Sequence, residues 1–473
     1  MLDQSFSAHN LEVIFDLENR KGNIDIDWMP VGYRDAAAEM KELRRQISEL
    51  KSKGRRKTEE DIARINELEK SYKKEKEKKE ASRQDFLKDC EEQINSKDFS
   101  FTMTKFWDDD SDKEVFTLNA DDPAVFFALK QLQYNIHKTF KVKQANRHAI
   151  LCDVKALLHT RMPLHIVRTD ISSFYESIPQ VALLDKVEGN TLLSHKSKAF
   201  IRAIINLYDD CKDDTLVAKG VGVPRGVGIS PLLSEIYVRD LDTNIKSYMG
   251  TQFYARYVDD IFIILTSLPD GMKDAKDYFA GLQTMFGKYG LTLKDETDPK
   301  KKCKLLDVVQ KDEAFDSFDY LGYSLTITRN NKKQTDVAFG LSTNKINHFK
   351  EKVDHIVTHF ENRSKVNIKE AYKDLFDLLN YITGNTKLFK SKSGVKVGLY
   401  YNNDLLDKKE DLDTLQQYMR DMVIEPSHNA TGWDTCKSKI TKRIEAINFR
   451  ERWEQKKMFH FSLARIQEME EWL

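Results

Sequence analysis

Two adjacent acids stand between two apolar runs that favour β-structure. The segment reads Phe253-Tyr254-Ala255-Arg256-Tyr257-Val258-Asp259-Asp260-Ile261-Phe262-Ile263-Ile264. This pattern predicts a β-hairpin whose tip carries Asp259 and Asp260, held rigidly by the strand ends. Neighbouring carboxylates that are partly buried repel each other, so a bound cation is their natural compensation. The tetrapeptide Tyr-x-Asp-Asp is too short to establish a function by itself.

A third acid ends a different apolar run. The segment reads His165-Ile166-Val167-Arg168-Thr169-Asp170-Ile171-Ser172-Ser173-Phe174-Tyr175. If this strand lies beside the hairpin in one sheet, Asp170 stands next to Asp259. The two acids could then hold two Mg²⁺ ions about 3.5–4 Å apart, one activating a hydroxyl nucleophile and the other neutralising a leaving pyrophosphate. Mg²⁺ suits such a site because it takes few protein carboxylates and leaves positions for substrate phosphates.

A glycine-rich segment lies between these acids. It reads Gly222-Val223-Pro224-Arg225-Gly226-Val227-Gly228-Ile229-Ser230-Pro231-Leu232-Leu233. We expect a loop that runs into a helix beginning near Pro231, with Ser230 as its N-cap. The glycines allow another backbone or a ligand to approach closely. Taken alone, the same pattern is typical of an ordinary loop-to-helix junction.

The overall charge balance gives no general attraction to polyanions, because 76 basic residues balance 76 acidic ones. Two stretches of the sequence depart from this balance because they carry basic residues and no acid. Residues 123–152 contain no acid and carry Lys130, Lys138, Lys141, Lys143 and Arg147. Residues 378–403 are likewise free of acids and carry Lys387, Lys390, Lys392 and Lys396. Any binding of a polyanion is expected at such runs, although each single cation is also typical of a solvated surface.

Several protein classes are not supported. There is no uncharged apolar stretch of about 18 residues, which argues against a membrane span, and no secretory signal pattern at the N-terminus. The five cysteines are scattered and form no Cys-x-x-Cys pair, so the sequence favours neither a disulfide framework nor a zinc ribbon. These features predict a protein of the reducing cytoplasm.

The elements around the acids differ along the chain. Residues 34–98 are highly charged, but two apolar seams run through them at helical spacing: Met40, Leu43, Ile47 and Leu50, then Ile62, Ile65, Leu68 and Tyr72. We expect an antiparallel helical hairpin. It would act as a spacer or oligomerisation arm, or it would contact nucleic acid through its basic tip, Arg55 to Lys57.

Residues 166–330 have the pattern of a compact α/β core. After about residue 341 the pattern is helical, interrupted by a hairpin or loop at 393–401.

Taken in order, the three acidic and glycine-rich segments resemble motifs A, B and C of reverse transcriptases, with 89 residues separating Asp170 from Asp259. Two further segments are similar to motif D (Tyr289 to Leu293) and to motif E, the primer grip (Phe318 to Tyr323). The resemblance covers about residues 100–330, and the helical remainder is only loosely similar to a thumb. It implies an α+β right-hand polymerase: an N-terminal fingers segment (1–33), the charged hairpin (34–98), fingers (99–165), palm (166–335) and a thumb-like region (336–473).

The resemblance also implies roles for individual residues. Asp170, Asp259 and Asp260 would be catalytic, and together with Ile171 they would form the metal site for two Mg²⁺ ions. The implied nucleotide-binding residues are Lys141, Lys143, Arg147, Ile171, Tyr175, Arg225 and Gly226. Those implied for primer and template are Ser230, Tyr257, Leu321 and Gly322. An aromatic ring at Tyr175 would collide with a 2′-hydroxyl, so deoxynucleotides are expected as substrates.

The implied activity is RNA-templated DNA synthesis. The string from Arg168 to Ile178 is most similar to bacterial defence reverse transcriptases of the abortive-infection and unknown-group lineages. The opening Ser5 to Asn10 and the charged insertion favour the type 3 system, in which two reverse transcriptases work with a noncoding RNA. The expected partners are an RNA template, a dedicated noncoding RNA, the DNA product, deoxynucleoside triphosphates, and either a second copy of the chain or a second reverse transcriptase subunit.

Two departures from the family pattern stand out. Motif B usually has Gln where this chain has Arg225. Motif D usually ends in Lys-Thr, but this chain has Glu296-Thr297, which leaves Lys294 or one of Lys300 to Lys302 to replace the usual lysine.

Template-independent or protein-primed DNA synthesis stays open as an alternative function, as does a retron-like enzyme making branched RNA-linked DNA. An RNA-binding scaffold with an inactive polymerase fold is a further alternative.

Overall fold

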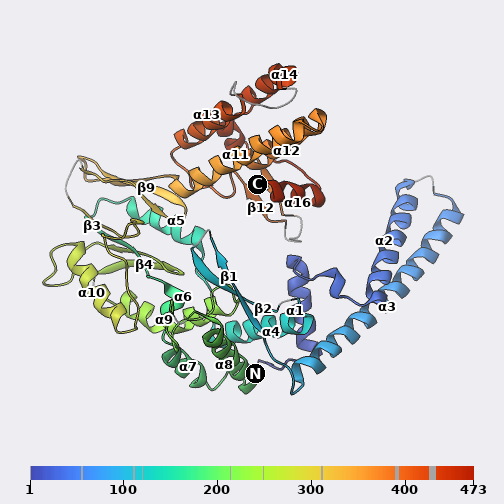
Figure 1. The fold of residues 1–473 in the computed structure, drawn as a ribbon, viewed down its shortest axis with the longest axis horizontal. Helices are drawn as coiled ribbons and strands as arrows, with labels where there is room; N and C mark the ends of the chain where they lie inside the picture. Colours follow the sequence, from blue (N-terminus) through green and yellow to red (C-terminus); the bar gives the residue numbers. More distant parts are fainter. Residues whose placement is uncertain are drawn as a thin grey trace. The chain divides into compact units, whose positions relative to one another are not determined.

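The computed structural model describes residues 2–54, 57–109, 112–119, 121–213, 215–248, 250–309, 313–388, 394–424 and 433–473, without the side chains of 433–435. The chain forms two compact units, one from Met1–Gln144 with Ser173–Asp240 and one from Ala145–Ser172 with Leu241–Leu473 (Figure 1). The basic residues Arg55, Arg56, Lys390 and Lys392 lie outside the described residues.

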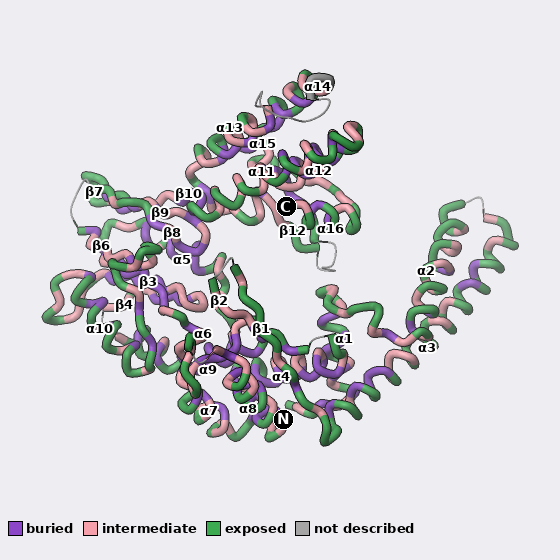
Figure 2. Tube along the Cα trace, viewed as in Figure 1, coloured by how far each residue is buried: buried purple, intermediate pink, exposed green. Residues whose placement is uncertain are grey.

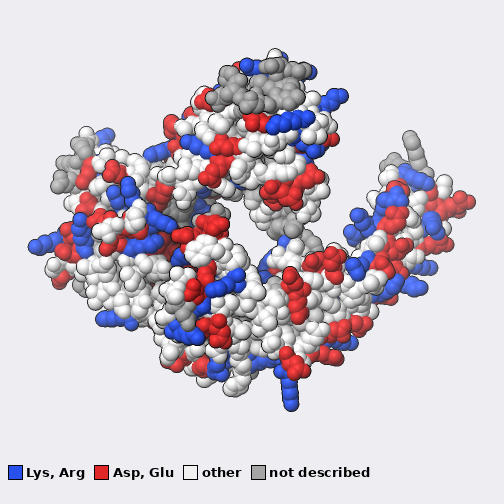
Figure 3. All heavy atoms as spheres, viewed as in Figure 1, with Lys and Arg blue, Asp and Glu red and all other residues white. Residues whose placement is uncertain are grey.

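The charged segment near the N-terminus forms the predicted helical hairpin. After α1 (Ala8–Lys21) and a short 3₁₀ turn (Ile26–Trp28), helix α2 (Val31–Ser52) packs against α3 (Glu59–Asn95). Leu43, Ile65 and Leu68 are buried along the seam, and Thr58 begins α3 with a capping box. The faces of α2 and α3 that point away from the seam are exposed and carry charges of both signs (Figures 2 and 3).

The rest of the first unit is mostly helical. A hairpin of β1 (Met103–Asp108) and β2 (Lys113–Leu118) precedes α4 (Pro123–Phe140), whose apolar face is buried. Helices α6 (Phe174–Ser177), α7 (Gln180–Glu188) and α8 (His195–Cys211) follow. Helix α9 (Ser230–Lys246) begins in this unit and ends in the second. It begins at Ser230 itself, one residue earlier than predicted.

A four-stranded antiparallel sheet forms the centre of the second unit, in the order β4-β5-β3-β6. Its strands are β3 (Leu164–Asp170), β4 (Thr251–Tyr257), β5 (Asp260–Leu265) and β6 (Lys304–Val308). Strand β3 lies between two neighbours and is buried along most of its length. It is therefore a rigid support for the acid at its end. Helices α5 (Arg147–Leu158) and α10 (Ala275–Gly287) belong to the same unit.

A second sheet continues the chain, with the order β10-β9-β7 and β8 paired to β9. Its strands are β7 (Glu313–Ala314), β8 (Phe318–Tyr320), β9 (Tyr323–Arg329) and β10 (Thr335–Leu341). Side chains from both sheets and from α5 share one apolar core, including Phe262, Tyr320 and Phe339. This shared core fixes the β8–β9 turn relative to the strand that carries Asp170.

The C-terminal part is helical, as the sequence predicts. It comprises α11 (Thr343–Ser364), α12 (Ile368–Thr383), α13 (Glu410–Ile424), α14 (Trp433–Glu445), α15 (Phe449–Glu454) and α16 (Leu463–Trp472). Of the interrupting segment predicted at 393–401, β12 (Lys396–Gly398) is a strand, and it pairs antiparallel with β11 (Asn385–Lys387), which lies before the predicted bounds. The chain thus has the predicted α+β character. Among the described helices, none combines the length and hydropathy needed to cross a membrane, and all five cysteines are free thiols.

Candidate active site

The hairpin predicted around the adjacent acids is present. Strands β4 and β5 pair Tyr257 with Asp260, so that Val258 and Asp259 form a two-residue turn. Val258 has a φ of 59°, a conformation that costs free energy for a β-branched residue. Arg256 supports this turn: its Nη1 donates to the Val258 carbonyl at 2.7 Å, while its Nη2 lies 2.8 Å from Asp242 Oδ2. The buried Arg256 side chain therefore helps to hold the turn that presents Asp259.

The backbone around Asp170 is held from two sides. The Ile171 amide donates to the Asp259 carbonyl at 3.0 Å, which joins the end of β3 to the hairpin turn. On the other side, Ser172 donates to Thr292, and the Lys294 amide donates to the Asp170 carbonyl at 2.9 Å. The segment that resembles motif D therefore runs directly beside the end of β3. These bonds fix the direction in which the Asp170 side chain leaves the sheet.

The three acids meet at this point. Asp170 pairs with Asp260 in the register of β3 and β5, and carboxylate oxygens of Asp170, Asp259 and Asp260 all lie within 4.8 Å of one another. Ile171 is fully buried and has a hydrocarbon side chain, so only its backbone could contribute to a metal site. The strand-end acids, which come from two distant parts of the sequence, thus lie together in the fold.

Three cations compensate two of the three acids. Arg168, which is 2% exposed, donates from Nη2 to Asp260 Oδ1 at 2.8 Å. Lys294 Nζ lies 2.8 Å from Asp170 Oδ1, and Lys302 Nζ lies 3.8 Å from Asp170 Oδ2. Within the described part of the chain, Asp259 forms no ion pair. It is therefore the carboxylate that most requires a further positive charge.

The electrostatics of the site agree with this reading. Burial raises the pKa of Asp259 above its ordinary value, and the neighbouring Asp170 and Asp260 raise it further. Burial also raises the pKa of Asp260, although Arg168 opposes the shift. A divalent cation would reverse both effects by favouring the ionised carboxylates. The donor set consists of hard carboxylate oxygens only, which fits Mg²⁺ better than metals that prefer nitrogen or sulfur.

Arg168 is not among the site residues that the sequence predicts. A signal was present, because residues 168 and 170 are two apart on a strand and therefore point to the same face of the sheet. A basic residue inside an otherwise apolar strand, on the face of a candidate catalytic acid, indicates an internal counter-ion. The structure also shows which of the candidate motif D lysines contact Asp170: Lys294 closely, and Lys302 at a longer distance.

Several predicted nucleotide-binding residues lie in the first unit. Glu176 accepts a hydrogen bond from Arg225 Nε at 2.9 Å, and the Arg225 guanidinium lies 5.2 Å from the centre of the Tyr175 ring. The unexpected arginine of the glycine-rich segment thus has an acidic partner one residue after Tyr175. Lys141 and Lys143 are exposed in the same unit.

The glycine-rich loop packs closely against strand β2. Gly226 has a φ of 91°, and a Cβ there would lie 2.7 Å from the Phe116 carbonyl oxygen, while the Phe116 amide donates to the Arg225 carbonyl at 2.8 Å. The predicted N-cap role of Ser230 is wrong. Ser230 lies inside the helix, and its buried hydroxyl donates to the Pro224 carbonyl at 2.6 Å, which closes the loop.

The segment that resembles a primer grip is a tight hairpin. Leu321 and Gly322 connect β8 to β9 with φ values of 43° and 75°, the pattern of a type I′ turn. Arg147 donates from Nε to the Leu321 carbonyl at 2.9 Å. The structure therefore places Arg147 in contact with this turn, whereas the sequence predicts a triphosphate contact. Tyr257 is half-buried and packs against the core beneath both sheets.

The segment that carries these features matches a known family. Residues 123–325 match the family described as "Reverse transcriptase (RNA-dependent DNA polymerase)". These residues form a reverse transcriptase domain. All five predicted motifs, from Asp170 to Tyr323, lie inside it, and the match confirms the predicted right-hand polymerase fold class.

The chain also has distant structural neighbours. Telomerase from Candida albicans, in a complex with the TWJ fragment of telomeric RNA, is 13% identical with a TM-score of 0.33; the match covers 67% of this chain and 56% of that one. Apo telomerase from Candida tropicalis is 13% identical with a TM-score of 0.32, over 79% of this chain and 62% of that one. The chain thus spans less than two thirds of either telomerase, and at these scores the assignment rests on the family match alone. No curated protein matches the sequence.

Proposed function

We propose that this protein is an RNA-templated DNA polymerase that adds deoxynucleotides to a primer. The observation that carries the proposal is the meeting of Asp170, Asp259 and Asp260 at the strand ends of a reverse transcriptase domain. In this reading Asp170 and Asp259 hold two Mg²⁺ ions, and Asp260 supports the site. Bound there, the ions would activate the primer 3′-hydroxyl and neutralise the leaving pyrophosphate.

The chain's own residues prepare the site for this chemistry. Arg168 holds the Asp260 carboxylate in place, and Arg256 holds the hairpin turn that carries Asp259. Lys294 and Lys302 supply positive charge at Asp170 before a substrate arrives. Because phosphoryl transfer depends mainly on positioning and on neutralising charge, this preorganised set of side chains matches what the reaction needs.

The substrate contacts belong to the same proposal. Tyr175 would lie under the incoming sugar and exclude a 2′-hydroxyl, with Arg225 and Glu176 holding its ring in place. Lys141, Lys143 and Arg147 would bind the triphosphate together with Ile171 and Gly226. Arg147 would have to leave its present partner to do so. Leu321, Gly322, Tyr257 and Ser230 would contact the primer and template.

The biological setting is proposed from the sequence resemblance. We place the enzyme in bacterial antiphage defence, in the abortive-infection and unknown-group lineages, with a dedicated noncoding RNA as template. A second reverse transcriptase subunit or a second copy of the chain would be its protein partner. The cytoplasm would be its location.

Primer extension on a defined RNA template tests the proposal. Purified protein, freed of copurifying nucleic acid by nuclease treatment, should extend a DNA primer with deoxynucleotides only when template and Mg²⁺ are present. Asp259→Asn should abolish extension while RNA binding is retained, whereas Asp270→Asn, which changes an exposed acid, should not alter it. Extension that persists without any template would refute the templated reading. Full activity of Asp259→Asn would refute the assigned site.

A further inference from the structure

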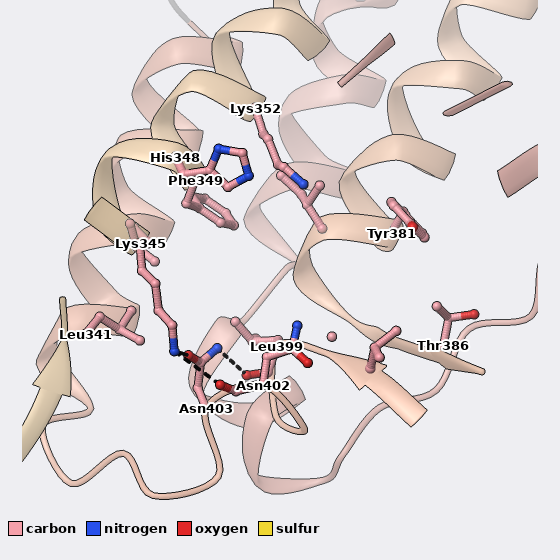
Figure 4. A pocket seen from close by; sticks show the side chains of 14 residues that line it. Leu341, Lys345, His348, Phe349, Lys352, Tyr381, Thr386, Leu399, Asn402 and Asn403 are labelled. Carbon is pink, nitrogen blue, oxygen red and sulfur yellow. Dashed lines mark hydrogen bonds between the residues drawn. The ribbon is translucent and has the colours of Figure 1, made fainter. Parts of the chain in front are cut away.

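A pocket of about 260 Å³ lies in the C-terminal helical region, outside the segment that matches the reverse transcriptase family. One wall is α11, and the other is built from α12, the β11–β12 hairpin and the turn at Asn402 and Asn403. All of these elements belong to the second unit. Figure 4 shows the pocket with the side chains that line it.

The α11 wall is basic. Lys345, His348 and Lys352 follow one another at intervals of three and four residues, which places them on one face of the helix. Lys345 donates only to neutral acceptors, the Asn402 carbonyl at 3.2 Å and Asn403 Oδ1 at 2.5 Å. Burial and the nearby Arg147 lower the pKa of Lys345 to about 8. Lys352 makes no ion pair among the described residues; burial lowers its pKa, and the nearby Glu470 opposes that shift.

The opposite wall comes from the acid-free run 378–403, whose role was left unassigned by the polymerase motifs. As a result, no carboxylate lines the pocket within the described part of the chain. Apolar side chains complete the lining, notably Phe349, Ile382 and Leu399. In Figure 4 Lys352 extends from α11 toward the middle of the pocket, and Lys345 extends from the same helix to Asn402 and Asn403 at its edge.

We propose that this pocket binds a nucleoside phosphate, with Lys345 and Lys352 on the phosphate and the apolar lining of Phe349 and Leu399 against the nucleoside. Half-buried lysines that make no ion pair among the described residues favour an anion, and a phosphate supplies several charged acceptors at once. The apolar lining favours a ligand with a flat, weakly polar body over inorganic phosphate alone. The choice of a nucleoside among such ligands rests on the proposed polymerase function.

The phosphate could belong to a free mononucleotide or to the 5′-terminal nucleotide of a strand. These two sources share one chemistry, so dAMP serves as the probe for both. Because dAMP binding at the pocket requires no divalent ion, the measurement is made in EDTA, where nucleotide incorporation cannot occur. Asp259→Asn should leave dAMP binding unchanged, which separates a failure of this proposal from a failure of the polymerase assignment.

Equilibrium dialysis of the full chain with radiolabelled dAMP tests the proposal. We expect one saturable site per chain, and Lys352→Met should weaken binding by roughly tenfold or more, as loss of a charge-assisted contact does. Lys345→Met should have a comparable effect. Lys350→Met is the matched control, because Lys350 lies on the same helix against Tyr418 and does not line the pocket; it should change binding by less than twofold.

The remaining comparisons decide what the pocket recognises. Inorganic phosphate and deoxyadenosine should each compete at least tenfold more weakly than dAMP, and equal competition by phosphate would overturn the nucleoside part of the proposal. If Lys352→Met weakens binding of a 5′-phosphorylated octanucleotide but not of its 5′-hydroxyl form, the phosphate belongs to the end of a strand. If Lys352→Met changes the binding of neither octanucleotide, the phosphate belongs to a free nucleotide. Absence of saturable dAMP binding, unchanged binding in Lys352→Met, or loss of binding in Asp259→Asn would overturn the proposal.

Discussion

Replacing Arg168 by methionine should destabilise the palm in a way that depends on pH. The guanidinium is 2% exposed and lies 2.8 Å from Asp260 Oδ1. Removing one member of a buried pair leaves the other charge uncompensated, at a cost of about 3–5 kcal/mol. Asp260 keeps 17% of its side chain exposed, and Lys302 lies nearby, so we expect the lower part of that range, about 3 kcal/mol at pH 8.

The sign of the pH dependence follows from the pKa of Asp260. Burial already raises this pKa, and loss of Arg168 removes the cation that opposes the shift. A folded state that binds a proton more tightly than the unfolded state loses stability as pH rises from the unfolded pKa through the folded one. The loss of stability in Arg168→Met should therefore be smaller at pH 5 than at pH 8. The difference should be about 1.4 kcal/mol for each unit by which the pKa of Asp260 rises further between pH 5 and pH 8.

Arg329 offers a matched control. It is also 2% exposed, but its partners are neutral: the carbonyls of Met162 and Arg161, and the Thr335 hydroxyl. Arg329→Met should cost a similar free energy, since buried acceptors lose their donor. That cost should be the same at pH 5 and pH 8, because no carboxylate is left uncompensated.

Urea unfolding in EDTA, followed by hydrogen exchange of peptides from β3 and β5, measures the free energy where the change is made. The double variant Arg168→Met with Asp260→Asn should recover about 2 kcal/mol relative to Arg168→Met at pH 8, because the orphaned charge is gone. A penalty for Arg168→Met that does not change with pH, or strictly additive losses in the double variant, would show that Arg168 does not act as the counter-ion of Asp260.

Three further predictions concern the ions and the substrate. Mg²⁺ at ten times its dissociation constant should raise the free energy of unfolding in calorimetry by about 1.4 kcal/mol for each ion bound, and an equal rise in Asp259→Asn would place the ions elsewhere. Lys294→Met should tighten Mn²⁺ binding about two- to fivefold in titrations without nucleotide, because a partly exposed cation no longer competes for Asp170; unchanged or weaker binding, or the same gain in Lys288→Met, would contradict this. Tyr175→Ala should raise ribonucleotide incorporation relative to deoxynucleotide incorporation by roughly 10- to 100-fold in single-turnover competition, and an unchanged ratio would remove the steric role of the ring.

The acidic cluster could be predicted because its geometry follows from local pattern. Two apolar runs around Asp259 and Asp260 predict a hairpin, and an apolar run that ends at Asp170 predicts a strand end. One additional assumption, that these strands are neighbours, brings the three acids together. The charged helical hairpin could be predicted equally well from the sequence, since the apolar residues of its two seams repeat at helical spacing and each seam has at least one buried residue.

Other features depend on contacts between distant residues, or on conformations that local preference disfavours. Arg147 contacts Leu321 across 174 residues, a pairing that no pattern near Arg147 indicates. Val258 and Leu321 occupy positive φ without being glycine, because the paired strands on either side leave only short turns. The acid that partners Arg225 stands 49 residues before it. Each of these features is imposed by tertiary structure.

The most direct test of the central claim is anomalous diffraction from crystals grown with Mn²⁺, a primer–template duplex and a non-hydrolysable deoxynucleotide. We expect two anomalous peaks about 3.5–4 Å apart, both in contact with carboxylate oxygens of Asp170 and Asp259. Peaks confined to other parts of the chain, with neither carboxylate coordinating a metal while the nucleotide is bound, would contradict it.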